Sequence, residues 1–326
     1  MALAPVDPFK RRIDYLRLSV TDRCNLRCRY CMPAEGVSKL DHEDVLRYEE
    51  ILRIARISVR MGISKIRITG GEPLVRKDIL YLCSNISQIQ GLKCLSLTTN
   101  GVLLPGFARK LFAAGISRIN ISLDTLDPAK YATITRMDAF KEVWRGILAA
   151  REAGIAPIKL NAVILRGIND DEIENLARLT MRHPFHVRFI ELMPFELQVP
   201  DCQFVSSDEI LAKLSAVAPL VPVPGPEGNG PAKHYTFSGA LGTIGLISPI
   251  SHHFCATCNR LRLTADGKVR PCLGRHGEVD LRTLLRDRAS EAQIAEQLAR
   301  AIGQKPLEHQ FRDAYSPCRP MVAVGG

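Results

Sequence analysis

The strongest constraint on the fold is an alternation that runs from residue 15 to about residue 193, where short β-rich runs are followed by longer stretches of helical periodicity. This order of elements predicts βα units, and such units build a parallel sheet. Six runs have the composition of strands: Tyr15–Val20, Lys65–Thr69, Cys94–Thr99, Arg118–Leu123, Ile158–Ile164 and Val187–Leu192. Six units in a region of this length predict an α/β fold whose sheet is barrel-like or doubly wound.

A helix is expected between the first two strands, because apolar residues recur there at steps of three and four residues. These positions are Val45, Tyr48, Leu52, Ala55 and Val59. Asp41 is placed to cap the start of this helix, and Gly62 is placed to end it. Further helices are expected near Ile79–Ile89, Leu103–Ala113, Phe140–Ala153 and Asp171–Met181.

Polar residues alternate with apolar ones along several of the predicted strands. On the first strand Leu16 and Leu18 face one side, while Arg17 and Ser19 face the other. The polar positions of the other strands are Arg67, Thr69, Asn120, Ser122, Asp124, Lys159 and Asn161. Because parallel strands are normally apolar on both faces, a polar face shared by several of them indicates a wet, cationic lumen that binds a ligand. The alternative is a set of edge strands with ordinary exposed charges.

A second region follows Pro194. Residues 221–231 are so rich in proline and glycine that they predict a loop. We expect a first domain over residues 1–220 and a smaller second domain over residues 221–326. Within the second domain the sequence predicts a hairpin over Lys233–Ile247, a cysteine-bearing segment over Phe254–Cys272 and a helix over Leu281–Ile302.

Composition narrows the class of protein. Of the 326 residues 46% are hydrophobic and 24% are charged, which argues against wholesale disorder. No apolar run approaches the ~18 residues that a membrane span needs, and residues 1–12 lack the apolar segment of a secretory signal, so we expect a cytoplasmic protein. Lys and Arg (44) exceed Asp and Glu (34) by 44 − 34 = 10, which favours an anionic partner. Ten cysteines in such a chain indicate metal ligands or buried thiols.

Cys24, Cys28 and Cys31 form a C-x3-C-x2-C group in the loop after the first strand, at the end where barrel enzymes place their chemistry. Three thiolates cannot complete a tetrahedral zinc site or bind all four irons of a cubane, so a metal bound here keeps one open position. The alternatives are three unrelated thiols, or zinc with a fourth ligand such as His42.

A second group, Cys255, Cys258 and Cys272, has the spacing C-x2-C-x13-C. A C-x2-C pair is the commonest zinc hook, so the plainest interpretation is a structural zinc site. The histidines that could complete such a site are His252, His253 and His276.

The first group resembles that of the radical S-adenosylmethionine (SAM) enzymes, because Tyr30 precedes the last cysteine and Gly70-Gly71-Glu72-Pro73 ends the second strand. This resemblance implies an incomplete (βα)6 TIM-like barrel with a smaller C-terminal α+β domain. It also implies a [4Fe–4S] cluster with one free iron, which SAM chelates through its amino and carboxylate groups before an electron splits the sulfonium to give a 5′-deoxyadenosyl radical. Glycine would let the backbone approach the methionine moiety closely.

The surroundings of the second group resemble one branch of that family, the GTP 3′,8-cyclases, which perform the first step of molybdenum cofactor (molybdopterin) biosynthesis. The most specific segments are Phe254–Leu263 and Pro271–Leu273. The resemblance runs nearly end to end, through Tyr15–Pro33, Arg67–Asp78, Leu97–Leu103, Asn120–Asp127, Val187–Pro194 and Gly325-Gly326. It implies a lyase that converts GTP to 3′,8-cyclo-7,8-dihydro-GTP.

Position by position, the resemblance implies the following roles. The cluster that acts on SAM is bound by Cys24, Cys28 and Cys31, and Arg17 joins them in the catalytic group. The SAM site is lined by Tyr30, Gly71, Ser122 and Met193. A second [4Fe–4S] cluster, whose open iron anchors the guanine, is bound by Cys255, Cys258 and Cys272. GTP is bound by Arg17, Arg67, Thr99, Lys159, Arg260 and Arg262, the cations mostly through its triphosphate, with Lys65 and Arg188 as weaker candidates.

Four cysteines match no ligand position and are expected to be small buried hydrophobes: Cys83, Cys94, Cys202 and Cys318. The paired glycines at residues 325 and 326 are expected to reach back into the active site, as they do in the family. The expected partners are a flavodoxin-like electron donor, the downstream cyclic pyranopterin monophosphate synthase and a second copy of the chain in a homodimer. No nucleic acid or membrane is expected.

Two other functions compete with this one. The first is a peptide-modifying radical SAM enzyme with an auxiliary cluster, which would not require Arg260 and Arg262 beside that cluster. The second is a zinc-bearing RNA-binding protein, suggested by the net charge of +10 and the C-x2-C pair. Aromatic residues, which such a protein uses to stack bases, make up only 6% of the chain.

Overall fold

The computed structural model describes residues 3–195, 204–226, 230–311 and 319–325. Their strands form a twelve-stranded sheet in the order β12-β11-β10-β1-β2-β3-β4-β5-β6-β9-β8-β7. The strands are β1 (Tyr15–Ser19), β2 (Lys65–Thr69), β3 (Cys94–Thr99), β4 (Arg118–Ser122), β5 (Ile158–Ile164), β6 (His186–Glu191), β7 (Leu220–Pro222), β8 (Lys233–Phe237), β9 (Thr243–Ile247), β10 (Arg260–Leu263), β11 (Lys268–Arg270) and β12 (Val279–Asp280).

Strands β1 to β6 lie in chain order and pair in parallel, which confirms the predicted α/β fold with a partial barrel. The C-terminal region extends both edges of this core. Strand β10 pairs in parallel with β1 at one edge, and β9 pairs in parallel with β6 at the other. Within the described residues the outermost strands, β12 and β7, do not pair with each other, so the barrel stays open.

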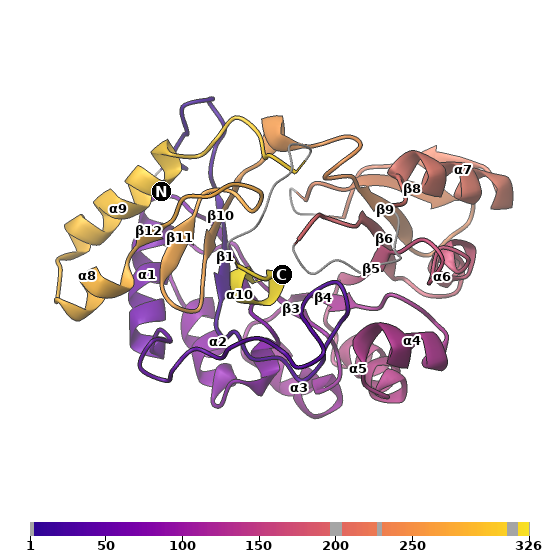
Figure 1. Ribbon diagram of the computed structural model, residues 1–326, viewed down its shortest axis with the longest axis horizontal. Helices are drawn as coiled ribbons and strands as arrows, with labels where there is room; N and C mark the ends of the chain where they lie inside the picture. Colours follow the sequence, from indigo (N-terminus) through magenta and orange to yellow (C-terminus); the bar gives the residue numbers. More distant parts are fainter. Residues whose placement is uncertain (1–2, 196–203, 227–229, 312–318, 326) are drawn as a thin grey trace.

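The helices of the βα units lie around the outer side of the curved sheet, and the C-terminal helix α10 lies within its curve (Figure 1). None of the described helices is both long and apolar enough to span a membrane. The helices are α1 (Tyr48–Arg60), α2 (Ile79–Ser87), α3 (Leu104–Ala113), α4 (Pro128–Thr135), α5 (Phe140–Glu152), α6 (Ile173–Arg182), α7 (Ser207–Val217), α8 (Arg282–Arg286), α9 (Glu291–Gly303) and α10 (Met321–Val324).

Side chains of the core strands separate into two environments, as the alternation predicts. Leu16 and Leu18 of β1 are fully buried in the main hydrophobic core between sheet and helices. Arg17, between them, faces a cavity on the inner side of the sheet. Because successive side chains of a strand point to opposite faces, one strand contributes both to the core and to the cavity.

Three local predictions are wrong. Asp41 does not cap the first helix: α1 begins only at Tyr48, because the Leu46 N–H donates to the Ala265 carbonyl (2.8 Å) and holds the preceding residues in the sheet-edge loop. The helix predicted over residues 281–302 is two helices, α8 and α9. The loop predicted from residue 221 begins later, because Val221 and Pro222 belong to β7, which pairs with β8.

Other local predictions hold. The hairpin over residues 233–247 is confirmed as the antiparallel pair β8–β9. Helices α4 and α7 lie in segments for which no helix is predicted, although α7 carries a recognisable start signal, a capping box of Ser206 and Glu209. The division of the chain into two domains at residue 220 stays a prediction.

A buried arginine joins the N-terminal segment to the C-terminal region. The Arg11 side chain pairs with Asp7 (2.5 Å), and both residues are almost completely buried. Its remaining N–H groups donate to the carbonyls of Cys255 (2.8 Å), Pro306 (2.6 Å) and Leu307 (2.9 Å). The Arg11 side chain therefore makes four hydrogen bonds, which join the N-terminal segment to Cys255 and to residues 306 and 307.

Replacing Arg11 with Ala is expected to lower the free energy of unfolding by about 3–5 kcal/mol, because it leaves a buried carboxylate unpaired and three carbonyls without their donor. Denaturant unfolding measures this change. The exposed neighbour offers a matched control: Arg12→Ala should change stability by less than about 0.5 kcal/mol. Similar losses in the two variants would contradict the assigned role of Arg11.

Candidate active site

A cavity of about 320 Å³ lies on the inner side of the sheet and brings together residues from all along the chain. This confirms the predicted polar lumen. Of the residues expected to bind SAM, the first cluster or GTP, the cavity wall includes Arg17, Cys24, Cys28, Tyr30, Cys31, Arg67, Gly71, Thr99, Ser122, Lys159, Met193, Arg260 and Arg262. The second group of cysteines is not part of this wall, although the chain neighbours Phe254 and Leu273 are.

The register of the sheet aligns three arginines across its strands. Arg17 of β1 is the partner of Arg67 on β2 and of Arg262 on β10. One register step away, Tyr15 is the partner of both Lys65 and Arg260. Strands of a parallel sheet lie less than about 5 Å apart along the hydrogen-bonding direction. Arg262, Arg17 and Arg67 therefore form a continuous row that faces the cavity.

Burial and mutual repulsion make the charged forms of these arginines less favourable. Burial and the neighbouring Arg262 hold the pKa of Arg17 well below its usual value. Burial and Arg260 lower the pKa of Arg262 to about 10. The Nε–H groups of Arg17 and Arg67 are buried without a hydrogen-bond partner among the described residues. Buried donors without a partner among the described residues suit a bound acceptor, and an anionic acceptor would offset the crowded charges.

A second set of cations lies on the opposite strands of the cavity. Burial and Arg188 lower the pKa of Lys159 to about 7. Burial and Arg67 lower the pKa of Arg188 to about 9, and its Nε–H is also buried without a described partner. Arg188, predicted only as a weaker candidate, therefore has the same features as the stronger ones.

The glycine pair after β2 contacts the loop that carries the first cysteines. The Gly71 N–H donates to the Thr21 carbonyl (2.8 Å), and the Glu72 N–H donates to the Arg23 carbonyl (2.8 Å). A Cβ at position 71 would lie 2.4 Å from the Arg23 carbonyl oxygen. This position therefore requires glycine, which lets the two loops touch.

Glu72 braces the same corner and has no predicted role in the sequence. It is fully buried, and its carboxylate accepts hydrogen bonds from the N–H groups of Leu74 (3.0 Å) and Asn100 (2.6 Å) and from the Thr99 hydroxyl (2.8 Å). Burial raises its pKa to about 7 despite these donors. Thr99 lies in the cavity wall as expected, but its hydroxyl proton is directed to Glu72, so its contact with GTP stays a prediction.

The first cysteines suit a metal cluster chemically. Cys24 Sγ accepts the Leu26 N–H (3.4 Å) and an amide N–H of Asn100 (3.8 Å). Burial raises the pKa of Cys31 to about 12. A thiol with a raised pKa stays protonated in the absence of a metal, whereas coordination to iron deprotonates it. N–H groups that point to the sulfur then stabilise the metal-bound thiolate.

Tyr30 is held beside these thiols by a second carboxylate. Its hydroxyl donates to Asp124 (2.7 Å), which also accepts the Val163 N–H (2.8 Å). Burial raises the pKa of Asp124 to about 6. This bond joins the first cysteine loop to the ends of β4 and β5 and fixes the direction of the Tyr30 ring.

One of the second cysteines, Cys258, lies in a different electrostatic environment, whereas burial raises the pKa of Cys255. Burial alone would raise the pKa of Cys258, but Arg260 and Lys305 lower it to about 6. Lys305 is buried, and its ammonium donates to the carbonyls of Arg260 (2.8 Å) and Pro271 (2.6 Å). No sequence pattern singles out Lys305, because it is one lysine after a helix and only the fold brings it to the cysteines.

No three His, Cys, Asp or Glu side chains in the described part of the chain converge closely enough to share one metal ion. Ligands of a four-iron cluster each bind a different iron, so they stand farther apart than ligands of one ion. The candidate zinc histidines make other contacts: His252 Nε2 lies 2.9 Å from the Asp208 carboxylate, and His253 Nε2 lies 3.4 Å from that of Glu308.

The C-terminal segment enters the cavity, as expected. The Gly325 carbonyl accepts N–H groups from Arg17 (3.3 Å) and Arg262 (3.2 Å). Gly325 has a φ of +76°, a left-handed conformation that favours glycine. Met321 and Val322 of α10 line the cavity. Gly326 lies outside the described residues.

The two described cysteines without a predicted ligand role lie in different environments. Cys83 is fully buried within α2, as expected. Cys94 is different: it is half-buried, and it lines the cavity at the start of β3 beside its register partner Lys65. The expectation that Cys94 is a buried hydrophobe is therefore wrong, because its position on β3 points it to the inner face. Cys202 and Cys318 lie outside the described residues.

Comparison with known proteins identifies the family. The radical SAM superfamily profile matches residues 18–180, and the Molybdenum Cofactor Synthesis C profile matches residues 185–311. The GTP 3′,8-cyclase of Moorella thermoacetica is 51% identical over 98% of this chain and 99% of its own. That of Heliobacterium modesticaldum is 50% identical over 98% of this chain and 100% of its own. The chain belongs to the GTP 3′,8-cyclase family.

Solved structures support the fold of this GTP 3′,8-cyclase family member. Streptococcus suis SuiB aligns with a TM-score of 0.58 and 14% identity over 90% of this chain and 66% of its own. SuiB bound to the precursor peptide SuiA aligns with a TM-score of 0.62 and 14% identity over 95% and 70%. The chain is thus a radical SAM enzyme of molybdenum cofactor biosynthesis whose cofactors are SAM and [4Fe–4S] clusters.

Replacing Gly71 with Ala is expected to weaken SAM binding at least tenfold, because the added methyl group would push the backbone of residues 22 and 23 and displace the loop that carries Cys24. Equilibrium dialysis of the reconstituted protein with labelled SAM measures this change. Gly106→Ala is a matched control, since no atom lies within 4 Å of its added Cβ. Unchanged SAM binding in Gly71→Ala would show that the two loops need not touch.

Proposed function

We propose that this chain cyclises GTP to 3′,8-cyclo-7,8-dihydro-GTP in the described cavity. The observation that carries the proposal is the row of arginines formed by Arg17, Arg67 and Arg262, which opens onto the same cavity as Cys24 and Tyr30. A polyanion is needed to offset this row, and a SAM site is needed to use the first cysteines. GTP beside SAM satisfies both requirements.

The arginines bind the triphosphate. A guanidinium offers a planar fork of donors that matches phosphate oxygens, and a charge-assisted bond of this kind is shorter and stronger than a neutral one. Arg17 and Arg67 each have a buried Nε–H for which the described residues offer no acceptor. The pKa of Lys159 is lowered to about 7. A bound anion would raise this pKa and favour the charged ammonium, so the attraction between Lys159 and the substrate increases on binding.

The guanine is held at the second cysteines, and the ribose is held between the two ends of the cavity. Cys255, Cys258 and Cys272 bind the second cluster, beside the arginines of β10. Arg260 and Arg262 follow Cys258 by two and four residues, so triphosphate and base are bound by one short stretch of chain. The first set of cysteines then faces the sugar.

SAM and its [4Fe–4S] cluster, when bound, supply the one-electron chemistry that removes a hydrogen atom from C3′ of the ribose. The protein holds C3′ close to C8 of the guanine, so that the new carbon–carbon bond forms within one molecule. An electron and a proton from outside the substrate replace the hydrogen atom and complete the product. Tyr30 and Met193 cover the SAM side of the cavity and exclude water from this step.

The partners beyond GTP belong to the same proposal and rest on the family resemblance. We expect a flavodoxin-like protein to supply electrons, a cyclic pyranopterin monophosphate synthase to receive the product, and two copies of the chain to form a homodimer. The reaction takes up electrons from outside the substrate, which calls for a donor protein, while the other two partners rest on the resemblance alone.

The two cysteine groups should be separable in anaerobically reconstituted protein. Cys28→Ser is expected to abolish formation of 5′-deoxyadenosine, because one ligand of the SAM-binding cluster is lost. Cys258→Ser should retain some uncoupled formation of 5′-deoxyadenosine and lose the cyclised nucleotide. Chromatography of both products, with each nucleoside triphosphate supplied in turn, measures the outcome. Product made at the normal rate by Cys258→Ser would mean that the second site is only structural.

The phosphate-binding arginines can be tested by comparing two ligands. Arg17→Ala, Arg260→Ala and Arg262→Ala should each weaken GTP binding by about 1.5–3 kcal/mol, the range for a hydrogen bond to a charged group. Guanosine, which lacks phosphates, should lose little. Isothermal titration of the reconstituted protein measures both, with the exposed Arg109→Ala on α3 as control. Equal losses for GTP and guanosine would contradict a phosphate role.

A further inference from the structure

The C-terminal helix α10 is too short to hold its own position. It has four residues, and an isolated helix of this length is not stable in water. Val322 and Val324 are almost completely buried, and Val324 packs with Phe195 and Phe311. These apolar contacts hold the C-terminal segment against the cavity. They do not determine how far Gly325 extends into the cavity.

The far end of the segment is held by the active site. The Gly325 carbonyl accepts N–H groups from Arg17 and Arg262, and the backbone of Val322 hydrogen-bonds Cys31. These are contacts with three residues proposed above to bind the substrate or the first cluster. A small displacement of the C-terminal segment would therefore disturb both the proposed substrate site and the first cysteine group.

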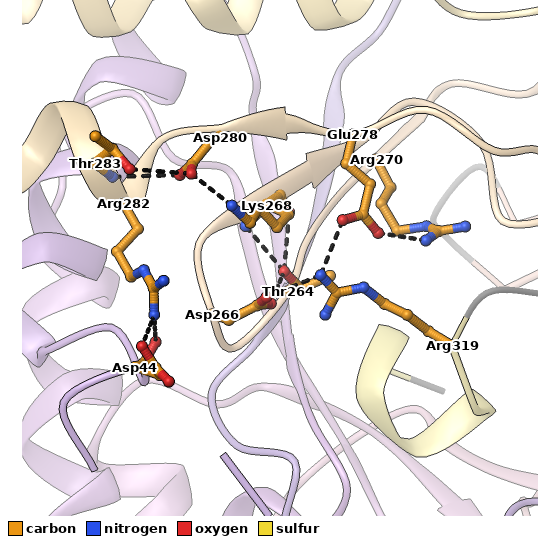
Figure 2. Close-up of polar contacts among 10 residues, drawn as sticks. All are labelled: Asp44, Thr264, Asp266, Lys268, Arg270, Glu278, Asp280, Arg282, Thr283 and Arg319. Carbon is orange, nitrogen blue, oxygen red and sulfur yellow. Dashed lines mark hydrogen bonds and ion pairs between the residues drawn. The ribbon is translucent and has the colours of Figure 1, made fainter. Parts of the chain in front are cut away.

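The near end is held by an arginine and two carboxylates (Figure 2). Arg319 Nη2 donates to Asp266 (2.9 Å) and to Glu278 (2.9 Å). The side chains of all three are mostly buried, with exposed fractions of 22%, 10% and 20%. Each carboxylate is fixed in turn, Asp266 by the Thr264 hydroxyl (2.5 Å) and Glu278 by Arg270.

We propose that Arg319 is a positioning residue, whose bonds to Asp266 and Glu278 set the starting point of the C-terminal segment and so hold Gly325 against Arg17 and Arg262. The inference rests on the proposed function. Asp266 lies in the turn between β10 and β11, four residues after Arg262. The anchor of the segment and one of its targets thus belong to the same hairpin, and they keep their spacing when the hairpin moves.

The hairpin itself does not depend on Arg319. Arg282 donates to the Asp44 carbonyl (3.0 Å) and binds its carboxylate, and Lys268 pairs with Asp280 on the neighbouring strand (Figure 2). Strand β10 is also paired with β1 along its length. Loss of Arg319 should therefore release the segment without disturbing the hairpin.

The test compares Arg319→Ala and Arg319→Lys with the wild-type protein, each reconstituted with its clusters. Arg319→Ala is expected to lower kcat/KM for GTP about tenfold or more, while iron content and the Kd for SAM stay unchanged. Arg319→Lys keeps a cation between the carboxylates and should retain most of the activity. Hydrogen–deuterium exchange should quicken in residues 319–325 of Arg319→Ala and stay unchanged in β10 and β11.

Arg282→Ala is the matched control, since it removes another arginine–carboxylate pair, the one that joins the start of α8 to Asp44. It should lower the temperature of unfolding and leave both kcat/KM and exchange of the segment unchanged. The proposal is overturned if Arg319→Ala keeps wild-type kcat/KM and exchange, or if Arg282→Ala loses as much kcat/KM. Should Arg319→Ala fail to fold, Asp266→Asn removes one of the two carboxylates and must show a smaller change of the same sign.

A chain ending at Val324 separates this inference from the proposed function. If that truncated chain loses GTP turnover while Arg319→Ala does not, the glycines act in the site but Arg319 does not position them. If the truncated chain turns over GTP as fast as the full chain, the segment has no part in the reaction. In that case the inference fails together with the assumption it rests on, while the arginine and cysteine variants still test GTP cyclisation independently.

Discussion

The active site depends on the burial of like charges in register. Arg262, Arg17 and Arg67 stand on three adjacent strands at the same level of the sheet, and burial lowers the pKa of the first two. Such a row is unfavourable until an anion joins it, because charged groups removed from water need a partner of opposite sign. The Gly325 carbonyl supplies a partial negative charge there, and a triphosphate would supply a full one. The site is therefore preorganised for a polyanion, and the rest of the fold keeps its cations in place.

This arrangement requires both ends of the chain. Strand β10 adds Arg262 to the edge of a sheet that the N-terminal βα units have already built. The Arg11 side chain donates to the Cys255 carbonyl, so the second cysteine group is held by a residue 244 positions earlier. The two cysteine groups differ in their surroundings. Burial and neighbouring acidic groups raise the pKa of Cys28, whereas Arg260 and Lys305 lower that of Cys258 despite its burial. Each group thus contains a thiol in a different electrostatic environment, although burial raises the pKa of Cys255 in the second group as well.

Much of this was predictable because it is local. The alternation of β-rich and helical runs predicts the six core strands to within one residue at each end. The alternation within β1, β2, β4 and β5 predicts most of the side chains that they contribute to the cavity. The errors are equally informative. The helix α1 begins seven residues after Asp41, because Leu46 is hydrogen-bonded to Ala265 of the distant hairpin, and no local signal reports such a contact. The expectation that Cys94 is a core residue is wrong although the strand pattern carries the answer, because Cys94 shares the face of Ser96 and Thr98, which line the cavity.

By itself the sequence determined the parallel α/β core, the inward face of four of its strands and the two groups of three cysteines, because these follow from spacing along a single segment and from the two-residue period of a strand. The tertiary structure decided which distant segments meet. It placed β10 beside β1, so that Arg262 joins Arg17. It brought Lys305 to Cys258 and the carboxylates of Asp266 and Glu278 to Arg319. Contacts of this kind depend on how separate elements pack against one shared core, and the pattern within any one element carries no record of them.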